Sequence, residues 1–368
     1  MTFARLAASS KRSDSERFGA DGMVYGLFAV AAIVCFYGAP IANWLKVFDY
    51  PRGGRKHHAS PTPQVGGLAI LLPAVLWLGV QVLTGHRDPF LIAILLCGSG
   101  VGIIGIMDDQ SQLSPALRLV VLSIFVLIAF ALDPLLYAPH IVWASFAPTS
   151  MSEWVFIVCA VIAIAGFVSS TNMADGINGL VPSALLVWSA AFAVFGEGPV
   201  RELAIALVGP SLVVLAFNLR GRVFLGDCGT FGIGFLIALM AIASLRSGKI
   251  AAETMLVWFS VPVLDCLRVI VTRLAAGRSP LKGGKDHFHH LLSDVFGKRR
   301  AFYAYTALIL VTSGVAAIFP RSAVYILLAL VAGCFGFIAA RASLERQRPV
   351  TALVGVRSAA TKGGNPAK

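Results

Sequence analysis

Three segments place carboxylates or a carboxamide at the edge of long apolar runs. Asp108 and Asp109 end one run, where adjacent carboxylates repel each other and lose hydration unless a cation or a donor compensates them. Asn172 and Asp175 are spaced to share one face of a helical turn. Asp227 precedes a further apolar segment, where helix N-terminal amides can hold phosphate and a carboxylate can hold its magnesium. A metal site or a general base is favoured, against a solvated helix end, a capping turn and an ordinary N-cap.

Basic and imidazole side chains carry charges that complement such a site. Five cations together suit a polyanionic substrate, although the default for each alone is topogenic charge: Arg55, Lys56, Arg118, Lys282 and Lys285. His287, His289 and His290 form a compact segment without a partnering Cys or Glu at zinc-site spacing. Contact with a phosphate or a leaving group is therefore a better interpretation than zinc.

Two further patterns lie inside apolar runs. Gly100, Gly102 and Gly105 match a dinucleotide-binding fingerprint, but no strand precedes them, so close helix packing is predicted instead. Asp265 and Arg268 are three residues apart within one run and are expected to pair with each other. Intramembrane charge is functional by default, and a structural role for the pair stays open.

The elements that position these residues must be membrane-spanning helices. Of 368 residues, 57% are hydrophobic and 13% are charged, and the mean hydropathy is +0.81, which is outside the range of soluble globular domains. A span needs about 20 mainly apolar residues. Runs of this kind cover 23–45, 65–84, 90–107, 116–133, 153–171, 179–195, 202–218, 230–246, 252–274, 303–319 and 322–340. The sequence predicts an all-α polytopic membrane protein with about eleven transmembrane helices.

The placement of basic residues predicts which end of the helices carries the site. Most Lys and Arg residues lie in or beside loops that follow odd-numbered runs, so these loops are expected to be cytoplasmic, with the basic N-terminal tail as the discordant segment. The loops that hold the polar segments all follow odd-numbered runs. We expect an active site formed by cytoplasmic loops, in a transmembrane catalytic domain over 23–341 between a polar tail (1–22) and a basic, disordered tail (342–368).

Five segments together resemble the signature of a known family. In order, RKHHASPTPQVGG, DDQSQLS with Arg118, NMADGING, FLGDCGT and HFHHLL resemble the motifs of the polyprenyl-phosphate N-acetylhexosamine-1-phosphate transferases, over residues 49–292. The resemblance implies Mg²⁺-dependent transfer of a sugar 1-phosphate, first of all N-acetylglucosamine 1-phosphate, from a UDP-sugar to undecaprenyl phosphate with release of UMP. Mn²⁺ is the expected substitute metal. A homodimer in the bacterial inner membrane, surrounded by membrane lipid and without a nucleic-acid partner, is also implied.

The resemblance also assigns roles by position. Asn172 and Asp227 match metal-binding positions, and the catalytic group is Asp108, Asp109, Asp175 and His287. The substrate-binding group is Lys56, His58, Arg118, Arg273, Lys285, His289 and His290. Two departures from the family pattern are Asn178, where the family commonly has an acidic residue, and Gly284 before Lys285, where an acidic residue often stands. Asp286 is the nearest carboxylate that could substitute.

Several alternatives stay open at this point. The product would be the first lipid-linked intermediate of a cell-envelope polysaccharide, as in lipopolysaccharide or cell-wall biogenesis, but a muramoyl-pentapeptide transferase or one specific for another UDP-N-acetylhexosamine fits the same motifs. A non-enzymatic lipid-sugar carrier or scaffold is the rival class. A carrier is expected to place ionisable groups near the bilayer midplane, whereas here they cluster at the ends of spans.

Overall fold

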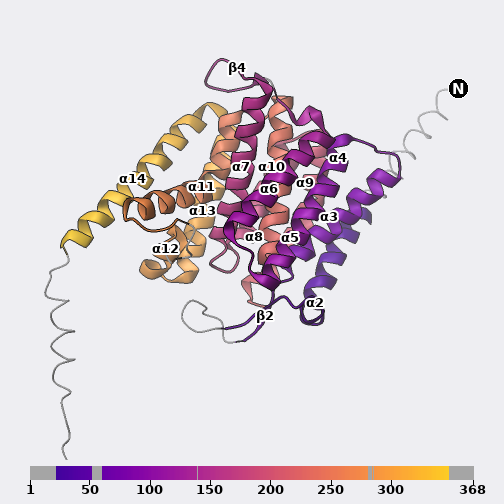
Figure 1. The fold of residues 1–368 in the computed structure, drawn as a ribbon, viewed down its shortest axis with the longest axis horizontal. Coiled ribbons are helices and arrows are strands. Elements are labelled where there is room, and N and C mark those ends of the chain that lie inside the picture. Colours follow the sequence, from indigo (N-terminus) through magenta and orange to yellow (C-terminus); the bar gives the residue numbers. More distant parts are fainter. Residues whose placement is uncertain (1–21, 52–59, 139, 281–283, 285, 348–368) are drawn as a thin grey trace, which may run out of the picture.

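The computed structural model describes residues 22–51, 60–138, 140–280, 284 and 286–347, with the backbone alone described over 340–347. Packed helices make up almost all of it (Figure 1), which confirms the predicted all-α membrane fold. After a first helix over Gly22–Phe36, the helices are α2 (Gly38–Leu45), α3 (Gly66–Leu83), α4 (Pro89–Ala93), η1 (Ile94–Gly98), α5 (Ser99–Ser111), α6 (Pro115–Leu132), η2 (Pro134–Leu136), α7 (Glu153–Ala174), α8 (Leu180–Phe195), α9 (Gly198–Leu219), α10 (Gly226–Ser247), α11 (Ala252–Ala275), α12 (Phe288–Phe296), α13 (Lys298–Ile318), η3 (Pro320–Ser322) and α14 (Ala323–Gln347). Two antiparallel pairs of short strands join β1 (Phe48–Asp49) to β2 (Thr62–Pro63) and β3 (His140–Ile141) to β4 (Thr149–Ser150).

Each predicted apolar run corresponds to one helix or to a bent pair of helices. Within the described ranges, 9 helices are long and apolar enough to cross a membrane. The helices Gly22–Phe36 and Gly38–Leu45 are bent by 71° at their junction and make a tenth span if they count as one. Helix α8, with 16 residues, is shorter than the usual span length. The predicted count of about eleven therefore includes one bent and one short element.

Helix α10 forms the centre of the bundle, and 83% of its span is buried. It packs against α3, α5 and α7. Small residues permit this close approach, because a Cβ on Gly105 would lie 2.5 Å from the carbonyl oxygen of Asp227, and one on Gly232 would lie 3.2 Å from the Cα of Gly102. The glycine pattern of α5 therefore serves helix packing, as the sequence predicted.

The polar motif segments lie at one end of the bundle. Figure 1 shows β2 and α12 near the lower edge, while the β3–β4 loop projects at the opposite edge. The C-terminal ends of α5, α7 and α11 and the N-terminal end of α10 lie at the lower end. The start of α3 is joined to the segment before α10 by backbone hydrogen bonds from Gly66 to Phe224 and from Gly67 to Leu225. Helix ends from distant parts of the chain thus meet at one surface.

Candidate active site

Asp109 fixes the start of helix α10. Its carboxylate accepts the backbone N–H of Asp227 at 3.0 and 2.9 Å, that of Cys228 at 3.3 Å and the side-chain amide of Gln64 at 3.1 Å. Gly226 precedes this helical turn with φ +72, a conformation that favours glycine. The sequence suggested that these helix N-terminal amides hold phosphate, and in this structure they hold the Asp109 carboxylate instead.

Asn172 and Asp227, the predicted metal-binding pair, meet across two helices. The Asn172 side chain, in the last turn of α7, donates through Nδ2 to Asp227 Oδ1 at 2.5 Å and to Thr230 Oγ1 at 2.9 Å. Thr230 lies one helical turn after Asp227 in α10 and shares its face. The structure therefore brings these residues together, although 55 positions separate the first two in sequence.

Asp108 is buried beside this pair, with a relative exposure of 1%. Its Oδ2 lies 2.9 Å from Arg118 Nε, its Oδ1 accepts the Leu113 amide at 2.6 Å, and it is within hydrogen-bonding range of Asp227. Arg118, in the first turn of α6, also donates to the Leu113 carbonyl at 3.0 Å. Asp108 and Asp109 from α5 and Asp227 from α10 thus lie close together. Among the described side chains, Arg118 is the cation that pairs with this group.

A magnesium ion fits the donor types of this cluster. No group of three or more His, Cys, Asp or Glu side chains is arranged to hold a metal within the described ranges. Magnesium does not need one, because it is usually bound by one or two carboxylates together with water and substrate phosphates. The buried Oδ2 of Asp108 lies against Arg118 Nε, and the carboxyl group of Asp227 is within hydrogen-bonding range of Asp108, so two buried carboxyl groups share one neighbouring cation. A hard divalent cation would offset that crowding of negative charge.

Asp175 follows the end of α7 and is half-buried. Desolvation raises the pKa of its carboxyl group to about 7. The next residue, Gly176, lies against the histidine segment, because an added Cβ there would come 2.1 Å from Nε2 of His289. The loop after α7 therefore connects the carboxylate cluster to the histidines. Asn178, the departure noted in the sequence, is exposed at the far end of this loop.

The histidine segment is anchored on α11. Asp265 pairs with Arg268 at 2.7 Å, as the sequence predicted, and also lies 3.2 Å from Nδ1 of His287. His287 and His289 stack with ring centroids 5.8 Å apart. His289 is fully buried, its two ring nitrogens have no partner among the described residues, and burial lowers its pKa to about 3. The ring is therefore neutral and packs between motifs, so its assigned contact with substrate stays a prediction that requires this region to open.

Arg273 is buried in a second ion pair. Its guanidinium contacts the Asp286 carboxylate at 2.6 and 2.9 Å and the Pro280 carbonyl at 3.0 Å. The hydrogen bond from Arg273 lowers the pKa of Asp286 to about 2. Asp286 thus occupies a structural position in front of the histidines, and a direct substrate contact for Arg273 stays a prediction.

Some predicted site residues lie outside the described part of the chain, and some residues of the observed site were not predicted. Lys56, His58 and Lys285, predicted to bind substrate, lie outside the described residues, and His290 lies beside His289 with ring centroids 4.2 Å apart. Sequence reasoning missed Gln64, Thr230 and Asn218, whose side chain accepts the Gly179 amide and donates to the Val223 carbonyl at 2.9 Å. Only Thr230 had a usable signal, its one-turn spacing from Asp227.

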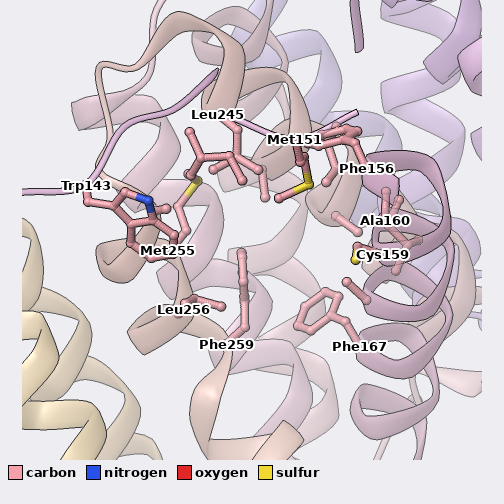
Figure 2. Close-up of a pocket in the computed structure, with 17 residues that line it drawn as sticks. Trp143, Met151, Phe156, Cys159, Ala160, Phe167, Leu245, Met255, Leu256 and Phe259 are labelled. Atoms are coloured by element: carbon pink, nitrogen blue, oxygen red, sulfur yellow. The ribbon is translucent and has the colours of Figure 1, made fainter. Parts of the chain in front are cut away.

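A separate apolar cavity of about 290 Å³ lies among α7, α10, α11 and the β3–β4 loop. Figure 2 shows Phe167 and Phe259 below it and Met151 and Leu245 above it. On α7 the lining runs from Phe156 to Phe167, so it ends five residues before Asn172, or about 7.5 Å at 1.5 Å per residue. The same three helices therefore carry a polar site at one end and an apolar cavity along their length.

The fold and the buried carboxylate cluster define a multi-pass membrane protein with a polar site at its surface. Residues 91–245 match the family described as glycosyl transferase family 4. That segment includes Asp108, Asn172 and Asp227, and ends before the histidine segment. This match and the curated relatives confirm the resemblance found in the sequence.

Curated relatives are similar over most of their length. The undecaprenyl-phosphate alpha-N-acetylglucosaminyl 1-phosphate transferase of Salmonella typhi is 26% identical over 304 residues, which cover 78% of this chain and 81% of the relative. The decaprenyl-phosphate N-acetylglucosaminephosphotransferase of Mycobacterium leprae is 27% identical over 307 residues, 72% of this chain and 75% of the relative. The undecaprenyl-phosphate alpha-N-acetylglucosaminyl 1-phosphate transferase of Escherichia coli (strain K12) is 24% identical, with 86% and 90% covered.

Proposed function

We propose that the chain transfers N-acetylglucosamine 1-phosphate from UDP-N-acetylglucosamine to undecaprenyl phosphate. The main support is the meeting of Asp108, Asn172 and Asp227, from three helices, beside Arg118. A phosphate oxygen of the lipid attacks the β-phosphorus of the donor, the bond between that phosphorus and the bridging oxygen breaks, and UMP leaves with the bridging oxygen. The product is the first lipid-linked intermediate of a cell-envelope polysaccharide.

Attack of one phosphate on another brings several negative charges together, so catalysis depends mainly on position and charge neutralisation. Asp108 and Asp227 would hold magnesium, which supplies a charge that neutralises the diphosphate. Arg118 is partly exposed, with 26% of its side chain accessible, and can reach a phosphate. Asp175, whose pKa is near 7, can take a proton from the lipid phosphate. Asp109 holds the loop that presents Asp227.

We place the chain in the bacterial inner membrane with the site facing the cytoplasm. The loops with the basic excess follow odd-numbered helical runs, which favours the cytoplasmic side. A nucleotide-activated sugar is a cytoplasmic metabolite class, and the polar helix ends gather at that one end of the bundle.

We propose that the apolar cavity holds isoprene units of the acceptor lipid that lie further along the lipid from its phosphate. It begins about 7.5 Å from Asn172 along α7, and its walls belong to the helices that carry the polar site. Ala163 lines it and is exposed, so Ala163→Trp fills the cavity without disturbing the core. The variant should raise KM for undecaprenyl phosphate and not for the UDP-sugar. Ile162→Trp, on the neighbouring exposed position outside the cavity, should leave both values unchanged, and equal effects of the two variants would contradict the assignment.

The direct test is UMP release by the purified, detergent-solubilised protein. Undecaprenyl phosphate, magnesium and UDP-N-acetylglucosamine are supplied together, and each is omitted in turn, with EDTA as the metal control. Release that depends on all three supports the transferase and the magnesium site. Release only with another UDP-N-acetylhexosamine supports the proposed reaction but shows that the donor substrate is a different sugar nucleotide. No release across a panel of UDP-sugars rejects the enzyme and favours a lipid-sugar carrier or scaffold.

A further inference from the structure

Helix α11 fixes the three residues at the start of the histidine segment one after another. Arg273 binds the Asp286 carboxylate, and Arg268 donates to the Asp286 carbonyl at 2.5 Å. The Asp265 carboxylate lies 3.2 Å from Nδ1 of His287 and accepts a hydrogen bond from the backbone amide of Phe288 at 2.9 Å. A buried stripe of charge on a membrane helix thus sets the position and the ring orientation of His287.

The two oxygens of Asp265 have different partners. Oδ1 receives three donors, which are Nε and Nη2 of Arg268, at 3.2 and 2.7 Å, and the Phe288 amide. Oδ2 faces Nδ1 of His287 alone among the described residues. Because a carboxylate accepts and cannot donate, Nδ1 of His287 must carry the proton, and in the neutral ring Nε2 keeps its lone pair.

We propose that Asp265 is a positioning residue that fixes the tautomer of His287, so that His287 presents Nε2 as a hydrogen-bond acceptor to the sugar nucleotide. The group that it recognises is a hydroxyl or amide N–H of the donor substrate, and not one of its anionic phosphate oxygens. The substrate in this inference rests on the proposed function, whereas the tautomer itself does not. The interaction with Asp265 occupies Nδ1, and Nε2 has no hydrogen-bond partner among the described residues.

Asp265→Asn is an almost isosteric test of this idea. The amide oxygen of the new side chain must occupy the Oδ1 position, where three donors converge. Its NH2 group then faces Nδ1 of His287 and donates to it, which moves the ring proton to Nε2. The packing and the hydrogen bond to Phe288 remain, and the acceptor that recognises the substrate becomes a donor.

The kinetic test measures UMP release at varied UDP-N-acetylglucosamine and at varied undecaprenyl phosphate. Asp265→Asn should raise KM for the sugar nucleotide by about 10- to 100-fold, because two donors then oppose each other in the site. KM for the lipid should stay within about twofold. Glu253→Gln is the matched control: it replaces a buried carboxylate at the other end of α11, which accepts the amides of Ala144 and Ser145, and should leave both constants unchanged. An unchanged KM for the sugar nucleotide in Asp265→Asn overturns the proposal.

The tautomer is measured without turnover, by nitrogen NMR of protein with ¹⁵N-labelled histidine. The chain has 7 His, and the loss of one signal in His287→Gln assigns the ring. In its neutral form, the ring of His287 in the unmodified protein should carry its proton on Nδ1, and Asp265→Asn should move it to Nε2. A proton on Nε2 of the unmodified protein overturns the proposal even if Asp265→Asn fails to fold. A correct tautomer in a protein that turns over no UDP-sugar rejects only the proposed function.

Discussion

Substitution of Gly67 tests the packing that presents Asp227. A Cβ at this position would lie 2.0 Å from the backbone nitrogen of Gly229, 2.3 Å from its Cα and 2.7 Å from the carbonyl carbon of Cys228. All three atoms belong to the backbone of the first turn of α10, so no side chain can rotate away. To bring the closest contact to even 3.0 Å, α3 and α10 must separate by about 1 Å.

Gly67→Ala should therefore be costly for both stability and turnover. Overpacking in a close-packed interior costs about 1–3 kcal/mol, and backbone contacts place this variant near the upper value. A displacement of about 1 Å at a catalytic group can lower the rate about 100-fold, and Asp227 lies two residues from Gly229. The measurements are thermal unfolding in detergent, followed by tryptophan fluorescence, and UMP release.

Gly79→Ala on the same helix is the matched control. An added Cβ there meets nothing within 4 Å, so the change should stabilise α3 by about 0.5–1 kcal/mol through lower backbone entropy of the unfolded chain. The two variants should thus shift the unfolding temperature in opposite directions. If Gly67→Ala is as stable and active as Gly79→Ala, the close contact of α3 with α10 is not as the structure shows it.

Three further predictions concern the charged groups. Arg118→Met leaves the buried Asp108 unpaired and should cost about 3 kcal/mol, which Asp108→Asn in the same chain should largely restore in unfolding experiments, and no recovery would contradict the pairing. Asp227→Asn should abolish magnesium-dependent UMP release yet raise the unfolding temperature in EDTA, because it removes one of the crowded carboxylates; a fall would refute the crowding. Burial lowers the pKa of His289 to about 3, below its value of about 6.5 in the unfolded chain, so stability should fall as pH drops from about 6.5 to about 3, by at most about 1.4 kcal/mol per pH unit. His289→Gln should flatten that slope, and an unchanged slope would show that another group causes it.

Much of the fold could be predicted because lipid leaves few alternatives. A chain in the bilayer must satisfy its backbone hydrogen bonds internally, so each apolar run of sufficient length becomes a helix. The bend of 71° between Gly22–Phe36 and Gly38–Leu45 lies inside one apolar run and left no mark in its hydropathy. A Cβ added at Gly38 would lie 3.2 Å from a methyl carbon of Val65 and 3.4 Å from one of Val223. The break therefore depends on contacts with distant segments.

The candidate site was predictable in its residue types and less so in their roles. Adjacent carboxylates at the end of a run indicated function for both Asp108 and Asp109, yet the structure separates them: one pairs with Arg118, and the other caps α10. Which carboxylate takes which partner depends on the approach of α10 to α5, a tertiary fact. The burial of His289 also depends on tertiary structure. Its sequence position gives no sign that the loop at Gly176, from a distant part of the chain, will pack against its ring.

The partners of these carboxylates explain why the site and the fold cannot be separated. Asp109 of α5 is held by amides of α10, Asp227 of α10 by Asn172 of α7, and Asp265 of α11 by the amide that begins α12. Each charge is stabilised by a group from another element, so no single helix can carry its functional residue in the observed position alone. Because unpaired buried carboxylates are costly, the bundle must assemble before the site exists. Changes at the glycine contacts between helices should therefore affect turnover as strongly as changes to the polar residues that touch the substrate.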